Sequence, residues 1–510
     1  MIRIAKTENG LVKGIEAADP RITAFKGVPF AAPPIGENRW RAPQPCQNWE
    51  GVREAYRFAP ISVQDTPGIG DDIYCREWHV DPEIEMGEDC LYLNIWTGAR
   101  SAEEKLPVLV WFYGGGLQWG YPAEMEFDGE RLARRGIVVV TVNYRINVFG
   151  FMAHPQLTEE QPDAPTNFGS LDQQAGIKWV IRNIAAFGGD PENITIAGQS
   201  AGGGSVLSQI ACPANKGLFQ KAVVMSGMIR SPYEKGGIGT PEPLSSAEEN
   251  GAGFFEFLGV STLEEARDLD AFHILHKYGE YVSSHRRMFT VEDGQFCVGD
   301  PLDLLAEGKC VDVSIMAGNT SDEFPSFLYA ESEEELVRKA GNCFGEQADK
   351  FLQFPEARTK EGSGCYAKAP GIECTIKSLF SEKKRRDSQN DYYYYRFDGE
   401  IPGWDNPGTF HSVDLWFFFE TLAKCWRPFV GRHYDLARQM CNYWANFIKT
   451  GNPNGTDVDG SPMPEWTPYS DETPCEMVFG RQGAVSVREE ENPFRDFLVE
   501  ALRHRLQEGT

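Results

Sequence analysis

The chain has 510 residues, 41% of them hydrophobic and 12% aromatic, which is enough for a large packed core. The formal net charge of −26 excludes a general affinity for nucleic acid or for an anionic membrane. The amino-terminal residues show no signal-peptide pattern, and no run of about 18 apolar residues predicts a membrane span. We therefore expect a cytoplasmic protein whose 12 scattered cysteines are mostly reduced.

Apolar runs along the chain predict a series of buried strands. Most runs are short and rich in β-branched residues, as expected for strands that are covered on both faces. They lie at 90–96, 107–112, 137–143, 194–196, 221–226, 311–318 and 392–397. Shorter strands are expected at 3–5, 10–14 and 23–30, before a proline-rich loop.

Segments with a helical spacing of apolar residues alternate with these runs. They lie at 129–135, 171–184, 206–210, 435–449 and 494–507. Strands that alternate with helices indicate an α/β fold with a mostly parallel central sheet and helices on both faces. Residues 230–310 and 325–390 are polar and predict large helical insertions over the active site. Because there is no repeat or low-complexity linker, we expect a single domain over residues 1–510.

The stretch Gly198-Gln199-Ser200-Ala201-Gly202 stands between a predicted strand and a predicted helix. This context is typical of a nucleophile elbow, in which a tight turn projects the serine hydroxyl above the sheet. The N–H group of Ala201 would then lie at the positive end of the helix. The five residues alone are equally typical of a flexible Gly/Ser-rich loop, so the interpretation depends on the rest of the chain.

A nucleophilic serine requires a carboxylate and a histidine, which follow it in that order in this type of fold. Of the six histidines after Ser200, only His411 follows a strong predicted strand by a loop rich in Gly, Pro and Asp. We predict His411 as the base; the alternative is a histidine that caps the following helix. The acid is expected after the strand at 311–318, where Asp322 and Glu323 both qualify and either could instead cap a helix.

Three glycines follow the predicted strand at 107–112. In Tyr113-Gly114-Gly115-Gly116-Leu117 they allow backbone N–H groups to turn towards a developing oxyanion. A flexible turn is the alternative. The position at the end of a buried strand favours an oxyanion hole, since this is where such glycines occur in lipases.

The sequence resembles the type B carboxylesterases, an α/β-hydrolase family that includes bacterial para-nitrobenzyl esterases and animal cholinesterases. The matching segments keep the family order over most of the chain. They are FKGVPFAAPPIGENRWRAPQP, EDCLYLNIW, YGGGL, VNYRINVFGF, the long segment from NFGSLDQQAG to GQSAGGGS, GNTSDEF, FHSVDLWFFF and WANFIKTGNPNG.

The resemblance implies an α/β-hydrolase fold and assigns the catalytic positions. It favours Glu323 over Asp322 as the acid, although Phe324 replaces the usual glycine of that loop. Tyr113 stands where many members have histidine, as it also does in cholinesterases. The matching positions are the triad Ser200, Glu323 and His411 and the oxyanion-hole residues Gly115, Gly116 and Ala201.

The resemblance also implies structural features. Ser226 matches a serine that supports the triad acid in relatives. A disulfide of secreted relatives would join Cys75 to Cys90, and we expect it to be absent or partial in a cytosolic protein. Two family ion pairs would join Arg39 to Glu88 and Arg145 to Asp172.

These residues predict a serine carboxylesterase that hydrolyses esters of small or aryl alcohols through an acyl-enzyme. The expected partner is a small-molecule ester, with no cofactor, no metal, and no nucleic acid or membrane partner, and the protein is expected to be a monomer or a weak homo-oligomer. A specialised feruloyl or phenolic-ester esterase is the alternative. A non-catalytic cholinesterase-like binding protein is disfavoured, because all three triad positions are intact.

Aromatic residues beside the motifs are candidates for the wall of the substrate pocket. They are Trp119, Phe324 and Phe410, whereas Trp416 is expected in the core. Gln199 is a further pocket candidate. It stands where cholinesterases have a glutamate that helps to hold a cation, and its neutral side chain therefore disfavours choline esters.

Overall fold

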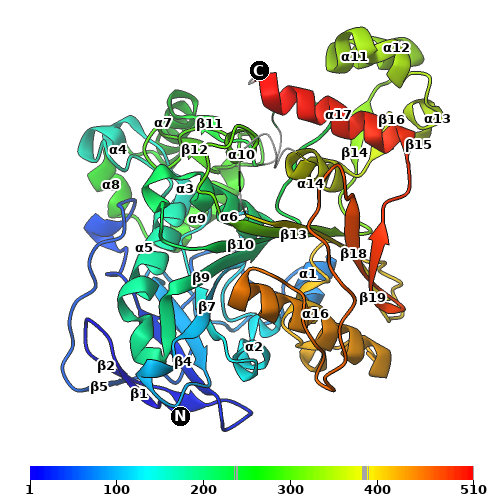
Figure 1. The fold of residues 1–510 in the computed structure, drawn as a ribbon. Coiled ribbons are helices and arrows are strands. Elements are labelled where there is room, and N and C mark those ends of the chain that lie inside the picture. Colours follow the sequence, from blue (N-terminus) through cyan, green and yellow to red (C-terminus); the bar gives the residue numbers. More distant parts are fainter. Residues whose placement is uncertain (235, 237–238, 382–387, 389, 509–510) are drawn as a thin grey trace.

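A computed structural model describes residues 1–234, 236, 239–381, 388 and 390–508 (Figure 1). An 11-stranded sheet lies at its centre, in the order β19-β18-β17-β13-β10-β9-β7-β8-β6-β4-β3. The strands are β3 (Ile15–Glu16), β4 (Thr23–Pro29), β6 (Tyr92–Thr97), β7 (Leu106–Phe112), β8 (Val138–Val142), β9 (Gly189–Gln199), β10 (Lys221–Met225), β13 (Ser314–Thr320), β17 (Tyr392–Asp398), β18 (Cys475–Gly480) and β19 (Gly483–Arg488).

The strands from β18 to β8 in this order run parallel to their neighbours. Antiparallel pairs occur only towards the two edges of the sheet, at β18–β19 and among β8, β6, β4 and β3. The central strands β8 and β10 are buried along their whole length, as their continuous apolar sequences predict. The prediction of an α/β fold with a mostly parallel sheet is therefore confirmed.

Helices pack on both sides of the central strands. In Figure 1, α6, α10 and α14 lie above these strands and α16 lies below them. Trp416 is fully buried in the core, as expected. The bounds of these four helices are α6 (Ala201–Ala211), α10 (Pro301–Ala306), α14 (Gly371–Ser381) and α16 (Gly431–Thr450). Two further long helices are α5 (Phe168–Asn183) and α17 (Pro493–Glu508).

Shorter elements complete the periphery. A small sheet near the amino terminus pairs β1 (Ile4–Lys6), β2 (Leu11–Lys13) and β5 (Val52–Glu54). The remaining short helices outside the two predicted insertions are α1 (Ile73–Glu77), α2 (Glu130–Arg134), α3 (Asn147–Phe151), α4 (Pro155–Glu160) and α15 (Leu415–Phe418).

The segment 230–310 is mainly helical, as predicted. It contains α7 (Leu244–Leu258), α8 (Leu263–Arg267) and α9 (Ala271–Tyr281), besides α10. It also contains two strands of two residues each, β11 (Glu242–Pro243) and β12 (Val291–Glu292), which pair with each other.

The prediction that 325–390 is helical is wrong in part. Besides α11 (Glu333–Phe344), α12 (Ala348–Phe351), α13 (Pro355–Arg358) and α14, this segment forms a three-stranded sheet of β14 (Ser326–Tyr329), β16 (Cys365–Ala369) and β15 (Lys360–Gly362). These strands are short, and β15 is fully exposed, so they carry too few alternating apolar residues to be distinguished from loops. Sequence analysis also missed β18 and β19 at the sheet edge.

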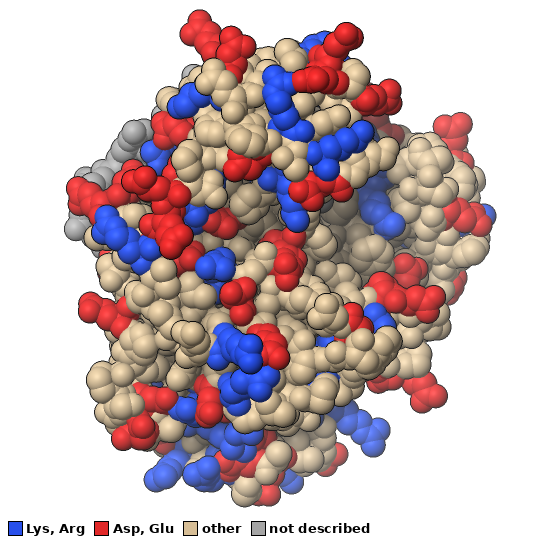
Figure 2. Space-filling view, turned by 90° about the vertical axis from the view of Figure 1, so that its right-hand side faces the viewer, with Lys and Arg blue, Asp and Glu red and all other residues tan. Residues whose placement is uncertain are grey.

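The face shown in Figure 2 carries acidic and basic side chains that are interspersed. The excess of 75 acidic over 49 basic residues is therefore not gathered into one patch on this face. The surface is hollowed to the right of the centre of this view.

All twelve cysteines lie in the described part of the chain, and Cys75 and Cys90 are free thiols. Cys75 and Cys90 therefore do not form the disulfide of secreted relatives. The Cys75 thiol instead contacts a carboxylate oxygen of Asp72 at 3.3 Å, and Cys90 is fully buried. No helix in the described ranges is long and apolar enough to cross a membrane.

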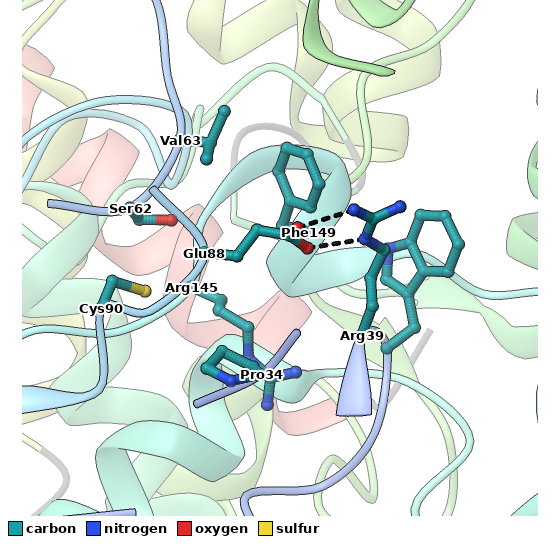
Figure 3. A pocket seen from close by; sticks show the side chains of 9 residues that line it. Pro34, Arg39, Ser62, Val63, Glu88, Cys90, Arg145 and Phe149 are labelled. Atoms are coloured by element: carbon teal, nitrogen blue, oxygen red, sulfur yellow. Dashed lines mark hydrogen bonds and ion pairs between the residues drawn. The ribbon is translucent and has the colours of Figure 1, made fainter. Parts of the chain in front are cut away.

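Two buried ion pairs tie loops beside the sheet to one another and to neighbouring helices. Arg39 binds Glu88 through two hydrogen bonds of 2.6 Å, and its remaining nitrogen donates to three carbonyl oxygens around the end of α8 (Figure 3). Arg145 binds Asp172 through bonds of 2.8 and 2.7 Å, and both side chains are almost inaccessible. The cavity between these pairs has a volume of about 10 Å³, room for one water molecule at most.

Replacement of Arg145 by methionine leaves the carboxylate of Asp172 buried without its partner. We expect Arg145→Met to lower the free energy of unfolding by about 3–5 kcal/mol. The matched control is Arg432→Met, because Arg432 and its partner Glu400 are both nearly half exposed; its expected cost is below about 1 kcal/mol. Denaturant titration measures both, and equal costs would contradict the prediction.

Candidate active site

The predicted site residues follow the carboxyl ends of four strands in the parallel part of the central sheet. β7 leads into Gly115 and Gly116, and β9 leads into Ser200. Glu323 follows β13, and His411 follows β17 after a longer loop. Because β7, β9, β10, β13 and β17 lie side by side and run parallel, residues far apart in sequence converge at one edge of the sheet.

Ser200 lies in the turn between β9 and α6 with φ 55° and ψ −124°, a strained conformation for a residue with a side chain. The turn requires small neighbours. A Cβ atom on Gly202 would lie 2.2 Å from the carbonyl oxygen of Phe112, and one on Gly198 would lie 2.3 Å from the carbonyl oxygen of Gly202. The local geometry is that of the predicted elbow.

Glu323 and His411 are in direct contact. Nδ1 of His411 lies 2.6 Å from Oε2 of Glu323, and both side chains are less than a tenth exposed. Asp322 does not contact the histidine. Its carboxylate instead accepts hydrogen bonds from the N–H and the hydroxyl of Thr409, at 2.7 and 2.9 Å, and so ties the Glu323 loop to the His411 loop. The geometry thus distinguishes the two candidates that the residues alone left open.

The environment of Glu323 favours its ionised form. Burial alone would raise the pKa of this carboxyl, but the positive charge and hydrogen bond of His411 outweigh it, together with the Ser226 hydroxyl and the N–H of Thr320, and the pKa lies below its ordinary value. The Ser226 hydroxyl is fully buried beside the carboxylate but makes no well-formed hydrogen bond to a described residue. The Glu323 carboxylate therefore accepts from Nδ1–H, and in the neutral ring this leaves the lone pair of Nε2 available.

The side-chain amide of Gln199 contacts Nε2 of His411. Its side-chain Nε2 lies 3.3 Å from Nε2 of His411, and Gln199 is 2% exposed. Among the described residues, Ser200 Oγ makes no hydrogen bond to His411 in this conformation. The amide of Gln199 thus donates to the same atom that a serine hydroxyl would use.

Three backbone N–H groups beside Ser200 have no acceptor within the described chain. Those of Gly115 and Gly116 lie in a turn where φ is 106° and 64°, conformations that favour glycine. That of Ala201 belongs to the first residue of α6 and has no intrahelical partner. Tyr113 points away from them, because its buried hydroxyl donates to Asn143 or to the carbonyl of Tyr144.

Aromatic side chains gather on the His411 side of Ser200. Phe324 lies 4.6 Å from the imidazole ring, and Phe410 packs against Trp78 with ring centroids 5.7 Å apart. Trp119 is not part of this aromatic group: its ring lies about 4.0 Å from where a Cβ atom on Gly116 would stand, and its indole N–H donates to Asp65. Sequence analysis missed Trp78 as a site residue because its segment carries no recognisable pattern.

A cavity of about 410 Å³ adjoins Ser200, Gly116 and Ala201. The described residues that line it include none of the four pocket candidates Trp119, Gln199, Phe324 and Phe410, whose role as pocket residues stays a prediction. Phe289 and Thr290, from the 230–310 segment, do line it, whereas no described residue of 325–390 does. Within the described residues no three His, Cys, Asp or Glu side chains gather as a metal site requires.

Asp414 is a fully buried carboxyl close to this site. It follows His411 by three residues, its Oδ2 accepts a hydrogen bond from the Tyr395 hydroxyl at 2.8 Å, and its Oδ1 has no partner in the described chain. Burial raises the pKa of Asp414 to about 7, and the nearby charge of Glu323 adds to this effect. Two neighbouring carboxyls are therefore driven towards opposite protonation states.

The raised pKa of Asp414 predicts a pH-dependent stability. An aspartate in the unfolded chain ionises near pH 4, whereas Asp414 in the native state holds its proton until about pH 7. Stability contributed by the neutral form is therefore lost as the pH rises from about 4 to about 7. Asp414→Asn keeps an acceptor for Tyr395 and cannot ionise. We expect this variant to raise the thermal unfolding midpoint more at about pH 8 than at about pH 5; a gain independent of pH would contradict the prediction.

Comparison with known proteins identifies the family. The model of the carboxylesterase family matches residues 2–365 and 371–495. Similar proteins include a cholinesterase of Mus musculus, 30% identical over 515 residues, which cover 91% of this chain and 81% of the relative. A para-nitrobenzyl esterase of Bacillus subtilis (strain 168) is 30% identical over 496 residues, with 92% and 93% covered.

A solved structure of a PNB esterase has a TM-score of 0.78 and 28% sequence identity, and the match covers 98% of this chain and 99% of the other. The α/β-hydrolase fold implied by the sequence is thereby confirmed. The family match spans all four strand ends at which the site is built. The chain belongs to the carboxylesterase family and is a carboxylic ester hydrolase.

Proposed function

We propose that the protein is a serine carboxylesterase that hydrolyses esters of small or aryl alcohols through an acyl-enzyme intermediate. The observation that carries this proposal is the contact of 2.6 Å between His411 Nδ1 and Glu323 Oε2, at a strand end beside the strained turn of Ser200. This arrangement supplies an oriented base beside the turn that carries the half-buried serine hydroxyl.

In the first step, Ser200 Oγ attacks the ester carbonyl and its proton passes to Nε2 of His411. The Glu323 carboxylate fixes the tautomer with a proton on Nδ1 and stabilises the imidazolium that forms. The amide of Gln199 must release Nε2 for this transfer, because a ring nitrogen has one lone pair.

The negative charge on the carbonyl oxygen is stabilised by the N–H groups of Gly115, Gly116 and Ala201. Since these groups have no other acceptor in the described chain, no hydrogen bond is broken when the oxyanion forms. Each such donor contributes about 3 kcal/mol to stabilisation of the transition state.

The alcohol then leaves with the proton that His411 carries. Because the proton comes from Nε2, the alcohol lies on the His411 side, among Phe324, Phe410 and Trp78. These rings support aryl alcohols as leaving groups. A water molecule activated by His411 releases the acid and restores Ser200.

Substitution of Ser200 tests the proposed nucleophile. We expect Ser200→Ala to lower kcat/KM for para-nitrophenyl acetate by at least about 10⁴-fold, because the covalent step is lost while the fold remains. A fluorophosphonate probe should label the wild type and fail to label the variant, with unchanged circular dichroism as the control. Labelling of Ser200→Ala, or retained turnover, would exclude Ser200 as the nucleophile.

Substitution of Gln199 tests its contact with the base. A carboxylate at this place favours the imidazolium over the neutral ring. In Gln199→Glu we therefore expect the acidic limb of the pH profile of kcat/KM to move to higher pH by about one unit. Gln199→Met removes the amide without adding charge and should move the limb less. An unchanged limb in Gln199→Glu would show that this side chain does not face the imidazole during turnover.

A further inference from the structure

The cavity beside Ser200 continues along α6, and we call it the α6 channel. From Ser200 to Ser208 the helix rises about 12 Å. Leu302 of α10, which packs against α6 in Figure 1, forms part of another wall. Four residues on one face of α6 line the channel: Ala201, Gly204, Ser205 and Ser208.

The α6 channel lies on the acyl side of the scissile bond. Its lining includes Ser200, Gly116 and Ala201, which surround the carbonyl group in the proposed mechanism. His411 and the aromatic rings beside it do not line it. Since the leaving alcohol must face His411 to receive its proton, the group left in the channel is the acyl chain.

Three of the polar side chains along the channel already have partners within the protein. The Ser205 hydroxyl accepts a hydrogen bond from a glutamine of α5 at 2.9 Å, and the Ser208 hydroxyl donates to the backbone one helical turn earlier, at 3.1 Å. The Asp300 carboxylate pairs with Arg230 at 2.6 Å. With Ile229, Phe289 and Leu302 adding apolar surface, the channel suits a hydrocarbon chain better than a polar one.

Gly204 leaves open space that the packing of α6 does not require. A Cβ atom on Gly203 would lie 2.9 Å from Gly227 Cα, and one on Gly202 would collide with Phe112, whereas one on Gly204 would meet no atom within 4 Å. Alanine is more stable than glycine inside a helix, so packing gives no reason for glycine here. The free volume above Gly204 belongs to the channel.

We propose that the α6 channel holds the acyl chain of the substrate and that Gly204 sets its permitted length, favouring unbranched chains of about octanoyl size. The proposal rests on the proposed function, because it assigns a substrate class to that same serine. Each methylene that enters the channel should raise kcat/KM by up to about fourfold. Chains longer than the channel gain nothing further.

The test compares para-nitrophenyl acetate, butyrate, octanoate and palmitate as substrates. For the wild type we expect the highest kcat/KM with octanoate. In Gly204→Leu the octanoate-to-acetate ratio of kcat/KM should fall by about tenfold or more, since the leucine takes the place of at least two methylenes. Gly279→Leu is the matched control, because Gly279 is an exposed helical glycine of α9 with equally open space, and its ratio should equal that of the wild type.

An unchanged ratio in Gly204→Leu overturns the proposal, as does a wild type that prefers acetate to octanoate. If Gly204→Leu fails to fold, the same comparison is made with Gly204→Ala. The octanoate-to-acetate ratio of kcat/KM in this variant should fall by about fourfold relative to the wild type. If the wild type hydrolyses none of these esters and is not labelled by the fluorophosphonate probe, the proposed esterase function itself is contradicted. This outcome differs from a failure of the acyl-chain proposal, in which the enzyme is active but its chain-length preference is not as expected.

Discussion

The close approach of α6 to the end of β7 is the constraint on which the site depends. Gly202 lies so near the carbonyl oxygen of Phe112 that no side chain fits between them. This contact forces the turn at Ser200 into a left-handed φ and brings the N–H of Ala201 beside the glycines that follow β7. The proposed nucleophile and the proposed oxyanion donors are thus placed by one helix–strand contact, which requires glycines at the points of closest approach.

The pKa values of the carboxyl groups near His411 depend on burial as well as on hydrogen-bond partners. Glu323 and Asp414 are both carboxyls in the interior, yet the pKa of Glu323 is lowered by His411 while that of Asp414 is raised to about 7. The difference lies in their partners, since Glu323 contacts the imidazole of His411 and Asp414 receives only a phenol hydroxyl. Two ionised carboxylates at this distance would compete for the imidazolium, and the burial of Asp414 limits that competition.

Much of the fold and the site could be predicted because both depend on local patterns. Continuous apolar runs mark β7, β8 and β10, which are covered on both faces. The Gly-x-Ser-x-Gly turn and the glycines after β7 are sterically demanded, so their sequence is informative. Strands β14 to β16 form a small separate sheet, and the hairpin of β18 and β19 closes one side of the central sheet; in both places a few apolar residues suffice and the pattern resembles a loop.

The substrate side of the site could not be predicted in the same way. The wall of the α6 channel combines residues of α6, α10 and the segment around Phe289, and only tertiary packing brings them together. The proximity of Trp78 to Phe410 has the same origin. Gly204 looks like one more glycine of the elbow in the sequence, and only the free space above it separates it from Gly202 and Gly203.

The bonds between Asp322 and Thr409 have a consequence for the reaction as well as for the fold. They join two loops whose proposed acid and base, Glu323 and His411, are 88 residues apart in the chain. The loss of conformational entropy needed to align Glu323 with His411 therefore occurs once, when the protein folds, and is not repeated at each turnover. Binding interactions with the ester can then act on the orientation of the substrate alone.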